Sequence, residues 1–175
     1  MEAQQTKQIF TQIYNKEADS LFRYCLLRVH EREKAIDIVQ DIFTEFWKKI
    51  NTGEKIKNER AYLFTLAHNK IIDWYRKKKS ESLDALLENE SEERPFDHPD
   101  EHSETDIISS SEAKNVLREI SKLEPVYRDV LYLRFAEDLS PQEIAMILDI
   151  TANTASVRIT RGIEKLREIF HTQNK

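Results

Sequence analysis

Residues 123–170 read LEPVYRDVLYLRFAEDLSPQEIAMILDITANTASVRITRGIEKLREIF, and this stretch decides how the C-terminal part of the chain folds. Ser140 and Glu143 form a capping box around a proline at the first helical position, which predicts that a helix begins there. Apolar residues follow at helical spacing until Asp149 interrupts the pattern. Residues 151–154 then supply the cap of a second helix. Two helices joined this closely predict a helix-turn-helix.

The second of these helices is basic and carries hydroxyl groups, which is typical of a helix that enters a DNA major groove. Arginine can bind guanine through two hydrogen bonds, and serine or threonine can contact bases or phosphate. The main-chain amides of the first turn suit a phosphate. The candidate DNA contacts are Asn153, Thr154, Ser156, Arg158, Thr160 and Arg161. Val157 lies among them and is expected to point into the core. A solvated basic face on an ordinary helical bundle is the alternative.

The composition predicts an all-α fold. The 175 residues include only two glycines and four prolines, which argues against a fold rich in strands or loops. No apolar run approaches the roughly 18 residues of a membrane span, so direct membrane insertion is not expected. Cys25 has no partner for an internal disulfide and is expected to be a core residue.

Signatures of catalysis and of bound groups are missing from the sequence. The five histidines are scattered, and no Cys/His cluster has the spacing of metal ligands. The chain has neither a glycine-rich phosphate loop nor a G-x-S-x-G motif. We therefore expect no catalytic residue, no metal, no cofactor and no enzymatic activity.

Charge divides the chain into three parts. Residues 1–79 carry 16 basic and 11 acidic residues, a net charge of +5. Residues 80–110 carry one basic and 11 acidic residues, and they include two of the four prolines. Residues 111–175 carry ten of each. This pattern predicts two small helical domains, 1–79 and 111–175, joined by a flexible acidic linker that cannot bury enough apolar surface to fold.

The first domain is expected to contain helices at about 9–29, with a break near Asn15, at 33–50 and at 59–79. In the middle helix the apolar stripe consists of Ile36, Val39, Phe43, Phe46, Trp47 and Ile50. An acidic stripe of Asp37, Asp41 and Glu45, with Gln40 beside it, lies away from these residues. Like charges four residues apart are mildly unfavourable, so the stripe indicates a basic partner. A simply solvated face is the alternative.

The third helix combines aromatic and basic residues toward its end. The group includes Tyr62, Phe64, His68, Asn69, Asp73, Trp74, Tyr75, Arg76, Lys77, Lys78 and Lys79. Aromatic rings and cations suit single-stranded nucleic acid, because bases stack and phosphates pair with positive charge. Basic residues at a helix C-terminus are also favoured by the helix dipole alone, so an ordinary helix end is the alternative.

Three motifs in series resemble the bacterial RNA polymerase sigma factors of the sigma-70 family, extracytoplasmic-function (ECF) subfamily. AIDIVQDIFTEFW at 35–47 resembles region 2.2 of that family, and ERAYLFTLAHNKIIDWYRKKKS at 59–80 resembles regions 2.3 and 2.4. The stretch 123–167 resembles region 4. The family often has glycine where this chain has Asp138, Asp149 and Asn153, which are residue types that tolerate left-handed backbone or cap helices.

The resemblance implies a transcription initiation factor that directs promoter-specific initiation and performs no chemistry. Asp37, Gln40, Asp41 and Glu45 would bind the β′ clamp helices of core RNA polymerase. Asn69, Asp73, Arg76, Lys77 and Lys78 would recognise and melt the −10 element. The −35 element would be read by Asn153, Thr154, Ser156, Arg158, Thr160 and Arg161. The β flap of polymerase would be a further contact.

The resemblance also implies an anti-sigma factor as partner and a cytoplasmic location, with the chain held at the inner membrane face when the anti-sigma factor binds it. The alternative function is a conventional helix-turn-helix transcriptional regulator, in which a helical N-terminal domain senses a ligand or dimerises. That alternative leaves the acidic stripe and the basic helix end without a role.

Overall fold

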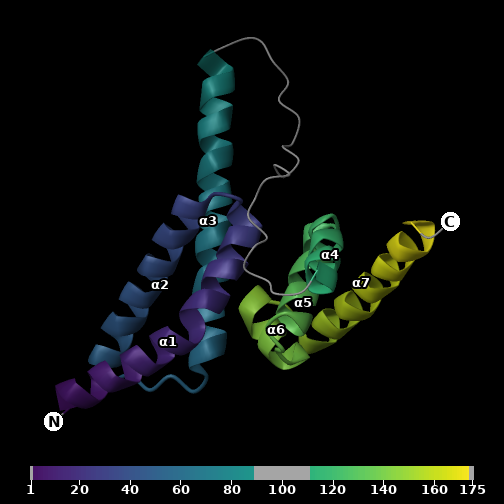
Figure 1. Ribbon diagram of the computed structural model, residues 1–175. Helices are drawn as coiled ribbons and strands as arrows, with labels where there is room; N and C mark the ends of the chain where they lie inside the picture. Colours follow the sequence, from purple (N-terminus) through teal and green to yellow (C-terminus); the bar gives the residue numbers. More distant parts are fainter. Residues whose placement is uncertain (1, 89–110, 174–175) are drawn as a thin grey trace. The chain divides into compact units, whose positions relative to one another are not determined.

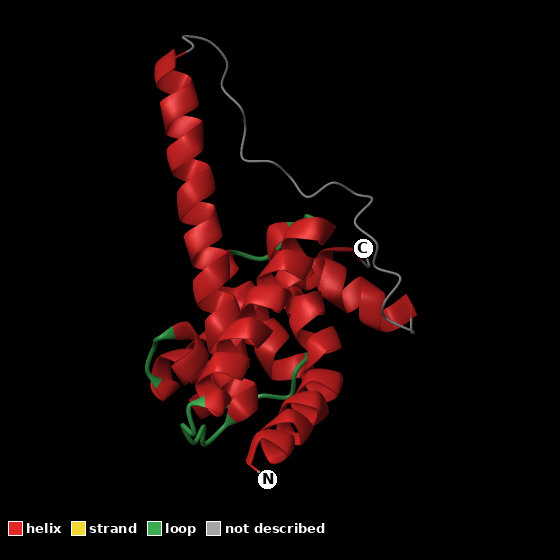
Figure 2. Ribbon diagram, turned by 90° about the vertical axis from the view of Figure 1, so that its left-hand side faces the viewer, coloured by secondary structure: helices red, strands yellow, loops and turns green. Residues whose placement is uncertain are grey.

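The computed structural model describes residues 2–88 and 111–173, and all regular structure within them is helical, which confirms the all-α fold (Figure 1, Figure 2). The helices are α1 (Glu2–Val29), α2 (Arg32–Asn51), α3 (Glu59–Glu88), α4 (Ser111–Ser121), α5 (Pro125–Phe135), α6 (Pro141–Leu148) and α7 (Ala152–Gln173). They divide into two compact units, α1–α3 and α4–α7. No helix in the described ranges combines the length and apolar character needed to cross a membrane.

In the first unit the three helices pack against one another around an apolar core. Its members include Leu21, Tyr24, Cys25, Ile38, Ile42, Phe43, Phe46, Leu63, Phe64, Ala67 and Ile71. The burial of Cys25 confirms its predicted place in the core and raises the pKa of its thiol to about 12. The predicted stripe on α2 is only partly right, because Ile36 is 38% exposed whereas Ile38 and Ile42 are buried.

Helix α1 runs without interruption from Glu2 to Val29, so the predicted break near Asn15 is wrong. Asparagine is a weak helix former, but packing against neighbouring helices overrides propensity. Tyr14, next to Asn15, contacts the ring of Phe43 on α2 with 4.6 Å between the centroids. Packing of this kind, on the residue adjoining the expected break, holds the helix together.

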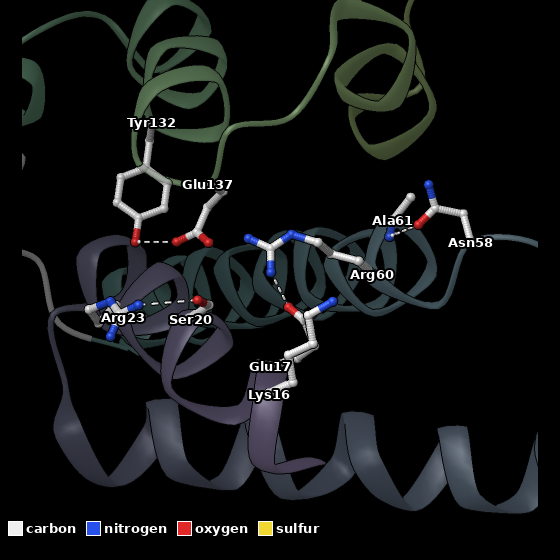
Figure 3. Close-up of polar contacts among 9 residues, drawn as sticks. All are labelled: Lys16, Glu17, Ser20, Arg23, Asn58, Arg60, Ala61, Tyr132 and Glu137. Carbon is white, nitrogen blue, oxygen red and sulfur yellow. Dashed lines mark hydrogen bonds and ion pairs between the residues drawn. The ribbon is translucent and has the colours of Figure 1, made fainter. Parts of the chain in front are cut away.

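A partly buried ion pair joins α1 to the start of α3. Glu17 is 2% exposed, and its carboxylate accepts a hydrogen bond from the guanidinium of Arg60 (Figure 3). The same guanidinium lies 5.2 Å from the ring centroid of Phe64. Asn58 caps the helix, since its Oδ1 accepts a hydrogen bond from the amide of Ala61 at 2.9 Å. These contacts fix where α3 begins.

Helix α3 is longer than predicted. The sequence pattern placed its end at Lys79, whereas the helix continues to Glu88. Four of the five residues at 83–87, LDALL, are leucine or alanine, which are good helix formers, and neither glycine nor proline interrupts the segment, which explains the extension. The C-terminal end of α3 projects past α1 and α2 (Figure 1). The remainder of the predicted acidic linker, 89–110, lies outside the described residues.

In the second unit the predicted helix-turn-helix is present. The Ser140 hydroxyl accepts from the amide of Glu143 at 3.3 Å, and the Glu143 carboxylate accepts from the amide of Ser140 at 2.8 Å, which confirms the capping box. Asp138 and Asp149 have φ angles of 51° and 52°. They therefore adopt the left-handed backbone that the sequence analysis expected them to tolerate.

Helix α7 packs closely on α5 at Gly162. A Cβ atom at this position would lie 2.9 Å from Cδ1 and 3.0 Å from Cγ of Leu131, a fully buried residue. The absence of a side chain lets the two helices approach one another. Ala155, two turns earlier on the same face of α7, is also fully buried. Small residues therefore define the inner face of α7.

We expect Gly162→Val to destabilise the second unit by about 2 kcal/mol, because the added side chain overpacks the contact with Leu131. Amide hydrogen exchange along α5 and α7 measures the opening free energy of this unit by itself. Arg167→Val places the same side chain at an exposed position of α7 and should cost no more than about 0.5 kcal/mol. Equal effects of the two substitutions would contradict the prediction.

Candidate nucleic-acid and protein interfaces

The acidic stripe lies on the outer side of α2, opposite the core. Asp37, Gln40 and Asp41 are exposed, while Glu45 is half-buried. Ile36 lies beside them as an exposed apolar side chain. The stripe is therefore a rigid, mainly acidic surface, and its predicted role in docking to polymerase stays a prediction.

A lysine from α3 reaches this stripe. The Nζ atom of Lys70 lies 2.5 Å from Oε1 of Glu45 and 4.0 Å from Oδ2 of Asp41. The ion pairs are partly exposed, so each contributes at most about 1 kcal/mol to stability. Lys70 could not be predicted from the sequence, because the contact exists only once α2 and α3 pack together. Lys70 also adjoins Asn69, so it links the stripe to the face of α3.

The candidate −10 residues lie along one exposed side of α3. Asn69, Asp73 and Arg76 follow each other at spacings of four and three residues, which places them on one face. Asp73 and Arg76 form an ion pair of 2.9 Å between exposed side chains. Ile72, which the sequence analysis did not select, is 46% exposed next to them. The face therefore offers amide, charged and apolar groups together.

The aromatic residues of α3 do not form one stacking surface. Phe64 is fully buried and cannot meet a base, contrary to the prediction, because it belongs to the core with Tyr24. His68 lies against the same tyrosine, 3.5 Å from its hydroxyl. The Tyr75 hydroxyl donates to the carbonyl of Arg28 and fixes that ring against α1.

Two aromatic rings of α3 lie beside lysines. Lys49 lies 5.0 Å from the ring centroid of Tyr62, and its hydrogen bond with the Glu54 carboxylate raises its pKa. Lys78 lies 4.8 Å from the centroid of Trp74 and 3.3 Å from a carboxylate oxygen of Glu31. The ammonium covers one face of each ring through cation–π attraction, and an exposed ammonium can also meet a phosphate. Lys77 is exposed at the same end of the helix.

Helix α7 begins with the predicted threonine cap. The Thr151 hydroxyl accepts a hydrogen bond from the amide of Thr154 at 3.1 Å, which stabilises the first turn. That amide is therefore engaged within the chain, contrary to the expectation that it would suit a phosphate. Asn153 is exposed in the same turn.

The outer face of α7 presents a shallow hollow lined by Ser156, Val157, Thr160, Arg161 and Glu164. The prediction that Val157 points into the core is wrong, since this side chain is 39% exposed. At 3.6 residues per turn, Val157 lies roughly opposite the buried Ala155. Arg158 is half-buried at the side of the hollow and does not line it.

The two hydroxyls of the hollow have a defined hydrogen-bonding direction. Ser156 donates to the carbonyl of Ala152 at 3.0 Å, and Thr160 donates to the carbonyl of Ser156 at 3.1 Å. Each hydroxyl hydrogen is used within the helix, so the oxygen lone pairs are what remains to meet a ligand. The hollow thus combines acceptors, one guanidinium, one carboxylate and one apolar side chain.

Two family descriptions match the chain. Residues 13–81 match "Sigma-70 region 2", and residues 113–166 match "Sigma-70, region 4". The chain is 30% identical over 163 residues to the ECF RNA polymerase sigma factor SigW of Bacillus subtilis, covering 91% of this chain and 87% of the relative. It is 26% identical over 164 residues to the RNA polymerase sigma factor YlaC of the same species, covering 89% and 92%.

Two solved structures share the fold. The sigma factor RpoE in complex with the anti-sigma factor NepR, from Bartonella quintana, has a TM-score of 0.71 at 23% identity and covers 94% of this chain and 98% of that one. CnrH in complex with the cytosolic domain of CnrY has a TM-score of 0.66 at 21% identity, covering 98% and 95%.

Removing the cap of α7 should loosen the start of the helix that carries the hollow. We expect Thr151→Ala to cost about 1 kcal/mol and to speed amide exchange in the first turn of α7. Asn153→Ala, in the same turn, should change stability by less than about 0.5 kcal/mol. If both variants exchanged alike, the hydroxyl of Thr151 would not be the cap.

Proposed function

We propose that three faces of this chain each make a different contact. The chain belongs to the sigma-70 family of RNA polymerase sigma factors and, within it, to the ECF group. The chain is accordingly an RNA polymerase sigma factor that acts in transcription initiation. One observation carries the proposal: α2, α3 and α7 each expose a row of polar side chains opposite a buried face. Each of these helices therefore offers a separate polar surface for one contact.

A conventional helix-turn-helix regulator is not favoured. That interpretation treats the N-terminal part as a sensor or a dimerisation domain, whereas residues 13–81 match sigma-70 region 2. It also gives no role to the exposed acids of α2.

The acidic stripe of α2 is the surface that docks on core RNA polymerase, at the β′ clamp helices. Asp37, Gln40 and Asp41 support this role, because they are exposed on a helix whose opposite side is core. Complementary charge steers association and fixes the orientation of two partners. Glu45 completes the surface, although Lys70 already pairs with it.

The outer face of α3 recognises and melts the −10 element. Asn69, Asp73 and Arg76 are exposed together, with Lys77 and Lys78 following on the same helix. Melting needs no chemistry, because an unstacked base can be captured by polar contacts while cations hold the phosphates. The chain would therefore act by binding and not as an enzyme.

The outer face of α7 reads the −35 element in the major groove. Arg161 lines the hollow, and Arg158 lies at its side. Ser156 and Thr160 present acceptor oxygens to base edges or bridging water. Asn153 and Thr154 lie at the N-terminal end of the helix, the end that contacts bases in helix-turn-helix proteins.

An anti-sigma factor is a further partner of this chain. Support comes from the RpoE structure, which contains the anti-sigma factor NepR, and from the CnrH structure, which contains the cytosolic domain of CnrY. The chain acts in the cytoplasm, where polymerase and promoter DNA are found. An anti-sigma factor would hold it inactive at the inner membrane face until a signal releases it.

Charge reversal on α2 should separate docking from DNA reading. We expect Asp37→Lys to weaken binding to core polymerase by about tenfold or more, because it faces a basic partner with a like charge. Asp19→Lys makes the same charge change at an exposed position of α1 and should bind as wild type does. Arg158→Ala with Arg161→Ala should keep polymerase binding and lose −35-dependent runoff transcription. Equal binding by the two lysine variants would contradict the assignment of α2.

The isolated chain should bind promoter DNA weakly. Its net charge is −5, and affinity for DNA grows with the number of phosphates neutralised. We expect a Kd no tighter than about 1 μM at physiological salt, measured by fluorescence anisotropy with duplex promoter DNA. Addition of core polymerase should tighten binding to the same DNA. Nanomolar binding without polymerase would contradict the prediction.

A further inference from the structure

Val157 is an apolar side chain in a polar stretch of the outer face of α7. It is a branched apolar side chain, 39% exposed, with Ser156, Thr160 and Arg161 around it on the outer face of α7. β-branched residues lose side-chain freedom in helices and gain nothing from facing water. Exposure to water therefore does not by itself favour valine at this position.

The core does not use Val157 either. The inner face of α7 contains Ala155 and Gly162, and Leu131 packs directly against Gly162. Val157 lies roughly opposite that face. The exposed part of the side chain is available to a ligand that binds the outer surface of α7.

The hollow itself limits what this ligand can be. Glu164 lines it together with Val157 and repels phosphate from that part of the surface. Arg161 lines the same hollow and attracts nucleic acid. A base edge meets both conditions better than the DNA backbone does, because it carries no formal charge and lies deeper in the groove.

Among base edges in the major groove, only thymine offers an apolar group, its 5-methyl. We infer that Val157 is a specificity-determining residue that selects thymine in the −35 element by packing against that methyl group. The inference rests on the proposed function of α7 in −35 recognition. The two hydroxyls do not bind this thymine through O4, because each donates its hydrogen within the helix; their oxygens suit the amino group of a neighbouring adenine or cytosine.

The position of the thymine relative to the base read by Arg161 also follows. Val157 and Arg161 are four residues apart, which corresponds to about 6 Å along the helix axis. Base pairs are spaced by about 3.4 Å. The selected thymine therefore lies within about two base pairs of the guanine that Arg161 binds.

The test removes the methyl group alone. Holoenzyme is assembled from full-length chain and core polymerase, and its preferred −35 element is selected from a random promoter library. Each thymine on either strand of that element is then replaced, one at a time, by deoxyuridine. At one position, within two base pairs of a guanine, we expect affinity to fall by roughly fourfold, the effect of one buried methyl group.

The variant Val157→Ala should bind the thymine and deoxyuridine promoters equally. Met146→Ala serves as the matched control, because Met146 is 59% exposed on α6 and does not line the hollow. It should keep the wild-type preference for thymine. Val157 is partly exposed and outside the core, so the Val157→Ala variant should fold. Amide exchange of α7 can verify this.

Three results would overturn the inference: a selected −35 element without thymine, no position sensitive to deoxyuridine, or an unchanged sensitivity in Val157→Ala. None of these results contradicts the proposal that α7 reads the −35 element, which Arg161→Ala tests separately. If Arg161→Ala left −35-dependent binding intact, the assignment of α7 to that element would fail as well. A methyl effect that disappears only in Val157→Ala supports the inference.

Discussion

The close approach of α7 to α5 at Gly162 decides what the second unit shows to its surroundings. Helix α7 has apolar residues on several sides, so its sequence allows more than one rotation about its axis. The missing side chain at Gly162, beside the buried Leu131, selects one of them. Once this face is inward, Val157 and Arg161 must be outward. The geometry of the surface that we propose reads DNA thus follows from a contact on the opposite side of the helix.

Interactions within a few residues could be predicted from the sequence. The capping box of Ser140 and Glu143 and the cap at Thr151 depend only on local spacing, and the structure has them as expected. The left-handed backbone at Asp149 follows from the same local chemistry. The acidic side of α2 was also predictable, because charged side chains seldom face a core.

Properties that depend on neighbouring helices could not be predicted. Phe64 and Val157 have side chains that suit either a core or a surface, and only the packing partner decides between them. Ile36 is exposed for the same reason. The approach of Lys70 to Glu45 joins residues 25 positions apart on different helices, and no local pattern marks it. The sequence therefore could not show which side of each helix faces the core, although it did predict that the helices exist.

Lys70 has a consequence for the energetics of assembly. A cationic group of another molecule that binds Glu45 must compete with the ammonium of Lys70, which already lies 2.5 Å from that carboxylate. If the incoming group wins, the displaced ammonium remains on α3 next to Asn69 and increases the local positive charge there. By reciprocity, an anion that draws Lys70 away leaves Glu45 more receptive to a cation. The ammonium of Lys70 thereby couples binding at the acidic stripe of α2 to binding at the exposed face of α3.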